Sequence, residues 1–228
     1  MKIKHLEWDS NFFELTIGSI YIEDEEDFLK EDLNKYDLIY IFSKNENLNF
    51  KLVDRKVTYK LRDLQKNETP NFIEIDYYCH NETAYKELLN LALQSGEYSR
   101  FKIDSDFKNN EFVRLYTEWI NNSINKKLAS HIIIKKQDDK IVGFTTLSKK
   151  SESLADIGLV AVDKDYRGQG IAKELILKTI SVAKSVGYED VQVVTQLDNI
   201  PANILYKKCG FEKDSIINIY HYWNHDTI

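Results

Sequence analysis

The stretch LADIGLVAVDKDYRGQGIAKEL, from Leu154 to Leu175, decides the fold. It begins with an apolar, β-branched run at 157–162, which is typical of a strand inside a sheet. A polar turn at 163–166 leads into RGQGIA at 167–172, and beyond it apolar residues recur every three or four positions, as on a helix. The stretch therefore predicts a strand, a glycine-rich turn and a helix.

The predicted turn is suited to binding a phosphate or pyrophosphate group. A helix N-terminus presents backbone N–H groups that have no partner within the helix, and it carries a partial positive charge. Glycine is needed there because a Cβ atom would hinder close approach of the ligand and would resist the required backbone angles. Gly168 and Gly170 meet this requirement.

The composition is that of an ordinary globular chain. Of the 228 residues, 43% are hydrophobic and 30% charged, and the 14 Tyr and 11 Phe argue against disorder. A net charge of −6 without a basic block argues against a nucleic-acid surface. No apolar run reaches the roughly 18 residues of a membrane span, and the first residues lack a signal-peptide core. Cys79 and Cys209 form neither a disulfide framework nor a metal set, so we expect reduced thiols and a cytoplasmic location.

The first hundred residues are interpreted as a separate α/β module. We expect a boundary in the polar stretch at 93–108, which separates an N-terminal module, residues 1–98, from a second domain, residues 105–228. The module is expected to contain helices at 24–35, 45–53 and 81–93 and strands at 15–22, 37–43, 56–64 and 72–78. The EWDSNFF stretch, Glu7 to Phe13, is interpreted as a capped turn with aromatic anchors.

The second half has a specific order of elements around the central stretch. We expect a helix at 111–124, a hairpin of strands at 130–136 and 140–147, a long helix ending at Gly187, a strand at 191–195, a short helix beginning near Pro201, and strands at 211–223. A phosphate loop for nucleotide hydrolysis is disfavoured because the Gly-Lys-Ser/Thr ending is absent. A dinucleotide fold is disfavoured because the third glycine position is Ala172 and an antiparallel hairpin precedes the motif.

From about Glu111 to Trp223 the chain resembles the GNAT superfamily of acetyl-CoA-dependent N-acetyltransferases. The segment RGQGIA at 167–172 is similar to the pyrophosphate-binding signature of that family, and Asn199, Asn203 and Tyr206 with Gly210-Phe211 are similar to its late segment. The resemblance implies an α/β (α+β) fold. We then expect a mixed, mostly antiparallel sheet with flanking helices and a splayed central strand pair, plus the smaller N-terminal module.

The start LEWDSNFF and the helix YTEWINNSI also resemble acetyltransferases of nucleotide-linked amino sugars, of the dTDP-fucosamine type. This resemblance implies direct transfer of acetyl from acetyl-CoA to a primary amine of a dTDP-linked amino-deoxysugar. Acetylation of a protein, a peptide or another small amine remains an alternative, and so does a non-catalytic acyl-CoA-binding module. The expected partner is thus a small-molecule amine, not a nucleic acid or a membrane, and a homodimer is one possible assembly.

The resemblance also implies roles for individual residues. The backbone N–H of Val160 is expected to polarise the thioester carbonyl, and Tyr206 to protonate the departing thiolate, since a phenol stays protonated at neutral pH. The expected acetyl-CoA contacts are Leu159, Val160, Ala161, Val162, Arg167, Gly168, Gln169, Gly170, Ile171, Ala172, Lys173, Asn199, Asn203 and Tyr206.

The sequence does not identify a general base or a metal site. Glu7, Asp9 and His131 are candidates for the base, and water is another, because a sugar amine is less basic than a lysine side chain. The histidines show no metal-ligand spacing and are all interpreted as structural: His5, His80, His131, His221 and His225. We therefore expect no metal.

Overall fold

The computed structural model describes residues 2–28, 33–66, 72 and 74–224. Within these residues, nine strands form one sheet in the order β1-β2-β3-β9-β4-β8-β7-β6-β5. Their bounds are β1 Lys4–His5, β2 Ile17–Tyr21, β3 Leu38–Ser43, β4 Lys51–Leu61, β5 His131–Gln137, β6 Lys140–Lys149, β7 Leu154–Val162, β8 Asp190–Gln196 and β9 Glu212–Trp223. Neighbours are antiparallel except for the pairs β2·β3 and β7·β8. The expected mixed, mostly antiparallel sheet is confirmed.

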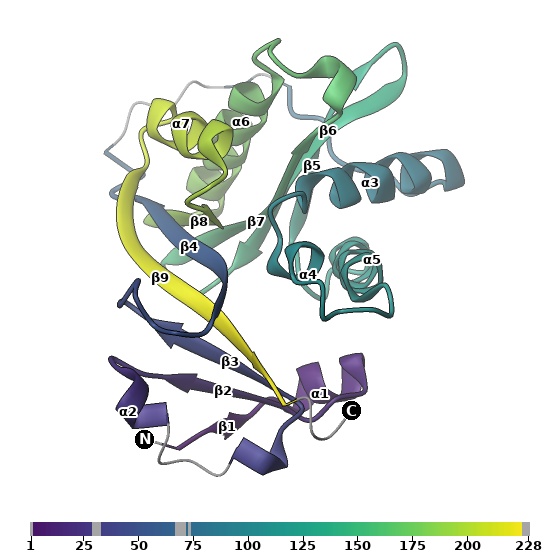
Figure 1. Cartoon of the computed structure of the whole chain (residues 1–228). Helices are drawn as coiled ribbons and strands as arrows, with labels where there is room; N and C mark the ends of the chain where they lie inside the picture. Colours follow the sequence, from purple (N-terminus) through teal and green to yellow (C-terminus); the bar gives the residue numbers. More distant parts are fainter. Residues whose placement is uncertain (1, 29–32, 67–71, 73, 225–228) are drawn as a thin grey trace.

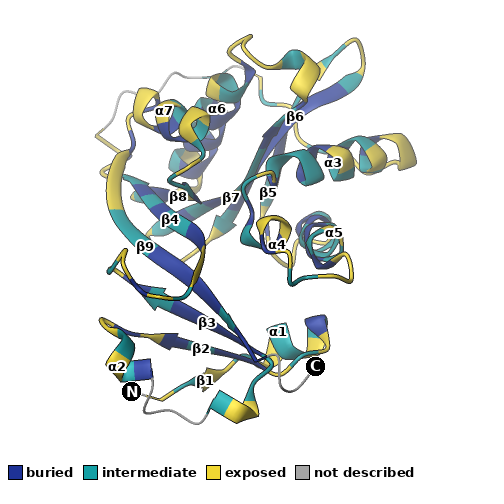
Figure 2. Cartoon of the chain, viewed as in Figure 1, coloured by how far each residue is buried: buried dark blue, intermediate teal, exposed yellow. Residues whose placement is uncertain are grey.

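Helices cover both faces of the sheet (Figure 1). Their bounds are α1 Glu7–Phe13, α2 Glu25–Phe28, α3 Glu82–Ser95, α4 Arg100–Ile103, α5 Glu111–Ile124, α6 Ile171–Val186 and α7 Ile200–Lys208, with short 3-10 turns η1 Leu33–Lys35 and η2 Lys164–Tyr166. Alternation along β5 shows the two faces, because Ile133 belongs to the core cluster that contains residues of α6, whereas Ile132 and Ile134 belong to the cluster that contains residues of α3 and α5. Many of the buried residues lie on the strands of the sheet (Figure 2).

Local sequence signals explain the elements that were predicted best. The β5–β6 hairpin turns at Asp138 and Asp139, whose φ angles of 48° and 64° are those of a two-residue type I′ turn. Asn81 begins α3 by accepting a hydrogen bond from the backbone N–H of Ala84. Gly187 ends α6 with a φ of 100°, as predicted.

Three local predictions were wrong. The segment expected as a helix at 45–53 has no helix, and its last residues begin β4 at Lys51. Of the strand expected at 72–78, the described part forms only an isolated bridge between Tyr77 and Ile133. The EWDSNFF stretch is a helix, α1, rather than a turn. Part of the helix expected at 24–35 lies outside the described residues, and its ends form α2 and η1.

Strand β4 joins the two halves of the chain. It comes from the first 98 residues, yet it lies between β8 and β9 and pairs with both in antiparallel fashion. Helix α3, from the same part of the sequence, packs on β6 and β7. The sheet is therefore continuous across the expected boundary, and the division into residues 1–98 and 105–228 stays a prediction about domains.

Candidate active site

A cleft opens in the middle of the sheet because β7 and β8 separate. The two strands pair in parallel only from Leu154 to Ile157. Beyond Ile157, β7 stays paired with β6, whereas β8 continues along β4 as far as Gln196. The expected splayed pair is thus present. The cleft has a volume of about 740 Å³ and is lined by β4, β7 and β8, by the N-terminal end of α6, by α7 and by the segment from α3 to α5.

The open edge of β7 exposes backbone groups. Leu159 donates its backbone N–H to Oγ1 of Thr146 at 2.8 Å, and Asp163 donates to the carbonyl of Val142 at 2.8 Å, so both point toward β6. Successive residues of a strand direct their N–H and C=O groups to opposite edges. The N–H of Val160 therefore faces the cleft side, where β8 has departed.

The glycine turn lies at the mouth of this cleft. Gly168 and Gly170 have φ angles of 80° and 81°, which side chains other than glycine adopt only with strain. Glu174 makes the first hydrogen bond of α6, to the carbonyl of Gly170, so the N–H groups of the preceding turn have no acceptor within the helix. Arg167 is exposed and donates from Nε to the carbonyl of Val162 at 3.2 Å.

Most residues predicted for the site line the cleft. They are Leu159, Val160, Ala161, Val162, Arg167, Gly168, Gly170, Ile171, Ala172, Lys173, Asn199 and Tyr206. Gln169 belongs to the same turn but does not line the cleft, and neither does Asn203.

Tyr206 reaches the cleft from α7 and is almost fully buried, with 4% of its surface exposed. Its ring packs between those of Tyr59 and Phe211, at centroid distances of 5.8 and 6.0 Å. Burial raises the pKa of Tyr206 above its ordinary value of 10.0, because the phenolate form would lose its hydration. The hydroxyl is therefore protonated at neutral pH and can donate a proton.

Asn199 and Asn203 shape the loop between β8 and α7. Asn199 caps α7 by accepting from the backbone N–H of Ala202 at 3.3 Å, and it lines the cleft. Asn203 is buried, and its amide nitrogen donates to the carbonyls of Gln196 at 2.9 Å and Asn199 at 2.7 Å. Because its donors are used within the protein, the geometry gives Asn203 a structural role and does not support the predicted contact with CoA.

The opposite wall of the cleft carries charged and aromatic residues that the sequence analysis did not single out. They are Asp54 and Lys56 from β4, Arg100 from α4, and Tyr116 and Trp119 from α5. Asp54 was missed because it falls between the helix expected at 45–53 and the strand expected at 56–64. The apolar alternation of Val53, Val57 and Tyr59 is interrupted next to Asp54, at Arg55, and that interruption is a weak signal in the sequence.

The charges of this wall are partly desolvated. Burial raises the pKa of Asp54 to about 6, and the positive charges of Arg100 and Lys56 oppose the shift. Burial and the charge of Arg100 lower the pKa of Lys56. The guanidinium of Arg100 lies over the rings of Tyr40 and Phe101, at 4.9 and 4.5 Å from their centroids, and its Nε has no hydrogen-bond partner among the described residues.

A buried carboxylate fixes α4, which carries Arg100, to the sheet. Asp104 follows α4 and accepts hydrogen bonds through Oδ2 from Nε1 of Trp223 at 2.9 Å and from Nδ1 of His221 at 2.6 Å. Both partners belong to β9. Lys51 of β4 pairs with the other oxygen. His221 is therefore structural, as predicted, whereas His225 lies outside the described residues.

The three candidates for a general base lie outside the cleft lining. Glu7 and Asp9 belong to α1, and burial raises the pKa of Asp9 while Arg100 opposes the shift. His131 is the first residue of β5, the edge strand of the sheet, where burial lowers its pKa. Within the described ranges, no cluster of three or more His, Cys, Asp or Glu side chains could hold a metal ion, and no helix could span a membrane.

Comparison with known proteins identifies the family. The sequence model of the Acetyltransferase (GNAT) family matches residues 84–211, more than half of the chain. The spore coat polysaccharide biosynthesis protein SpsD of Bacillus subtilis (strain 168) is 28% identical over 157 residues. That match includes 69% of this chain and 53% of SpsD, so the chain spans only about half the length of this relative.

Solved structures agree with the fold. A functionally unknown conserved protein from Staphylococcus epidermidis ATCC 12228 superposes with a TM-score of 0.62 at 14% identity, over 91% of this chain and 84% of its own. An acetyltransferase of the GNAT family from Colwellia psychrerythraea gives a TM-score of 0.56 at 16% identity, over 82% of this chain and 66% of its own. At these identities the likeness concerns the fold alone.

Proposed function

This chain belongs to the GNAT family of acetyltransferases, and we propose that it transfers the acetyl group of acetyl-CoA to the primary amine of a nucleotide-linked amino-deoxysugar. Acetyl-CoA is the co-substrate of the family. The acceptor is the part of the proposal that is specific to this chain. The observation that carries it is the cleft wall opposite the glycine turn, where two cations and two aromatic residues come together.

The glycine turn is suited to the pyrophosphate of CoA. Its N–H groups and the positive end of the α6 dipole together attract an anion. The positive φ angles of Gly168 and Gly170 and the open space at their Cβ positions support this fit, because a ligand can approach the backbone closely there. Arg167 and Lys173 add positive charge at the mouth of the cleft.

The open edge of β7 is suited to the rest of the cofactor. The pantetheine arm contains amides that can pair with free strand groups, as an added strand does. The N–H of Val160 then donates to the thioester carbonyl and stabilises the oxyanion that forms when the amine attacks. A donor of this kind is typically worth about 3 kcal/mol. This role rests on the direction of the Val160 N–H, which the hydrogen bonds of its neighbours determine.

Tyr206 is proposed to donate the proton that the departing thiolate of CoA requires. The side chain lines the cleft, and burial raises its pKa, so the donor form is present over the whole physiological pH range. The buried thiol of Cys209 next to it also has a pKa raised by burial, to about 11, and therefore stays neutral. The proposed proton donation by Tyr206 therefore requires no ionised side chain next to it.

The charged wall supports an acceptor that is both anionic and aromatic. The guanidinium of Arg100 and the ammonium of Lys56 both line the cleft and can bind phosphate oxygens, and an arginine does so with a directed geometry. Trp119 lines the cleft with a half-buried ring on which a nucleotide base can stack, and the buried ring of Tyr116 packs against it at a centroid distance of 4.9 Å. A nucleotide-linked sugar combines these two chemistries. The relative named for spore coat polysaccharide biosynthesis supports an acceptor from sugar metabolism.

The test is acetyl-CoA turnover with a panel of amines: dTDP-linked amino-deoxysugars, the same sugars without the nucleotide, peptides and polyamines. We expect turnover with a nucleotide-linked sugar, and a kcat/KM at least tenfold lower for the free sugar. Arg100→Gln should remove most of this preference by raising KM for the nucleotide-linked sugar alone. Faster turnover of peptides or polyamines would replace the proposed acceptor, and binding of CoA without turnover of any amine would indicate a non-catalytic module.

A further inference from the structure

Asp54 lies where the sheet opens. It is two residues before Lys56, which pairs with Gln196, the last residue of β8. Asp54 therefore lies just beyond the end of β8, at the end of the sheet where β7 and β8 have separated. The bulge in β4 between Leu52 and Asp54 changes the alternation at this point. Asp54 and Lys56 are two residues apart on β4, so their side chains lie on the same face of the strand, and both line the cleft wall.

The carboxylate of Asp54 is buried but incompletely paired. Only 8% of the residue is exposed, and its Oδ1 has no hydrogen-bond partner among the described residues. Buried polar atoms without a partner are rare, and each calls for an explanation such as a catalytic role or a bound water. The other carboxylate in the cleft wall, Glu97, is exposed to solvent.

We propose that Asp54 is the general base of the reaction and takes the proton that the acceptor amine must lose. This proposal rests on the proposed acetyl transfer but not on the identity of the acceptor. An amine in the cleft lies between the open edge of β7, which binds the thioester, and β4, which carries Asp54. Asp54 thus approaches the nitrogen from the side opposite to the acetyl group.

The protons of the reaction balance with Asp54 and Tyr206 alone. The acceptor enters as an ammonium ion, and the carboxylate of Asp54 takes one proton, which frees the nitrogen lone pair. The C–N bond forms, the oxyanion develops, and the C–S bond then breaks. Tyr206 gives its proton to the sulfur and recovers one from the nitrogen through the cleft. Asp54 returns its proton to water, so the products are the amide, the thiol of CoA and one proton.

The surroundings of Asp54 give it a suitable basicity. The groups that face it are Arg100 of α4, Lys56 of its own strand, Gln196 of β8, Asp198 of the following loop and Tyr116 of α5. Burial outweighs the two cations, so the pKa of Asp54 rises from 3.8 to about 6. A carboxylate with a pKa just below 7 is ionised at neutral pH, and it is a stronger base than an ordinary carboxylate. The rate should therefore fall as the pH drops through about 6.

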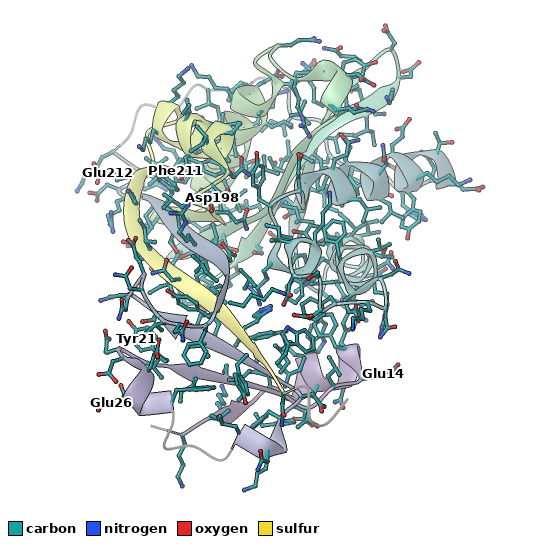
Figure 3. The ribbon with its side chains drawn as sticks, in the orientation of Figure 1. Glu14, Tyr21, Glu26, Asp198, Phe211 and Glu212 are labelled. Atoms are coloured by element: carbon teal, nitrogen blue, oxygen red, sulfur yellow. The ribbon has the colours of Figure 1, made fainter. Side chains whose placement is uncertain are left out.

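Asp198 is fixed on the exposed side of this group and does not compete for the role. Asp198, labelled in Figure 3, forms a bidentate ion pair with Arg55 of β4. Its side chain is 58% exposed. It acts on Asp54 only through its charge, which raises the pKa of Asp54 further.

The experiment measures kcat and kcat/KM against pH between 5 and 9, with the panel amine that turns over fastest, for the natural chain and for Asp54→Asn and Asp54→Glu. General-base catalysis is worth about 100- to 10,000-fold. We expect Asp54→Asn to lower kcat at pH 7.5 by at least 100-fold and to abolish the acidic limb near pH 6, with the affinity for CoA changed less than threefold. Asp54→Glu should restore part of the rate together with an acidic limb.

The matched control is Asp214→Asn, which removes a carboxylate from the same sheet. Asp214 belongs to β9, pairs with Lys60 and Arg62, and lies outside the cleft lining. Its kcat and pH profile should match those of the natural chain.

Several results would overturn the role of Asp54. They are an Asp54→Asn rate within threefold of the natural one, an unchanged acidic limb, or a carboxyl titration near pH 4 in ¹³C NMR difference spectra. If only a non-sugar amine is turned over, the proposal of a sugar acceptor is wrong. The role of Asp54 is then still tested by the same variants with that amine. If Asp54→Asn also loses affinity for CoA, the Asp54→Glu variant decides whether Asp54 is the base. A carboxylate with a purely structural role would not give this variant an acidic limb in its pH profile.

Discussion

The hydroxyl of Tyr59 in β4 donates a 2.9 Å hydrogen bond to Oδ1 of Asn203 in α7. The two residues are 144 positions apart in the sequence, and both are buried. This bond connects the strand that carries Asp54 to the helix that carries Tyr206. The strand of the proposed base and the helix of the proposed acid are therefore linked by a buried hydrogen bond, in addition to the pairing of β4 with β8 and β9.

Replacement of Tyr59 and replacement of Asn203 should destabilise the fold by different amounts. Tyr59→Phe loses one hydrogen bond and should lower the free energy of unfolding by about 1 kcal/mol. Asn203→Ala should lower it by about 2–3 kcal/mol, because it leaves the Tyr59 hydroxyl buried without a partner and removes the hydrogen bonds from the Asn203 amide to the carbonyls of Gln196 and Asn199. Urea denaturation measures both. In the double variant the two effects should not add, and additivity would mean that the bond does not couple β4 to α7.

Replacement of Asp54 should make the protein more stable and less active. The folded-state pKa of about 6 lies above the ordinary 3.8, so ionised Asp54 opposes folding. This cost grows as the pH rises from about 4 to 6 and is complete above that range. Asp54→Asn should then raise the free energy of unfolding at pH 8 by roughly 2–3 kcal/mol and leave it unchanged at pH 4. Urea denaturation at the two pH values measures it, and a loss of stability at pH 8 would contradict the electrostatic assignment.

The two glycines at the ends of α6 allow a matched test of the cofactor site. Gly170 and Gly187 both have positive φ angles, 81° and 100°, and nothing lies within 4 Å of a Cβ built on either. Gly170→Val and Gly187→Val should each cost about 1–2 kcal/mol of stability, because the left-handed region disfavours a branched side chain. Only Gly170→Val should weaken CoA binding, by at least tenfold in calorimetric titration. Equal affinities in the two variants would mean that the turn does not bind the pyrophosphate.

Tyr206→Phe separates proton donation from binding. The ring can remain between Tyr59 and Phe211, so the cleft keeps its shape. We expect kcat to fall about 100-fold, as is typical when a general acid is removed, while the affinity for CoA stays within threefold. Steady-state kinetics and calorimetry give the two values. A large loss of affinity with an unchanged kcat would make Tyr206 a binding residue instead.

Local signals were sufficient for the central part of the fold. The strand, glycine turn and helix at 154–186 were predicted correctly because periodicity and glycine positions act over a few residues. The same holds for the β5–β6 hairpin and for the helix expected at 81–93, which α3 contains almost completely. Most of the predicted cofactor contacts line the cleft because they belong to this continuous segment.

The sequence by itself therefore determined the strand–turn–helix unit and the position of Tyr206 after it, since both depend on neighbours along the chain. Only the tertiary structure decided that β4 lies between β8 and β9 and that Asp54 and Arg100 meet in the cleft. Strand pairing joins residues that are more than a hundred positions apart, and no local pattern encodes the partner. The bulge at Asp54 and its burial follow from that pairing, so the proposed base was not visible in the sequence.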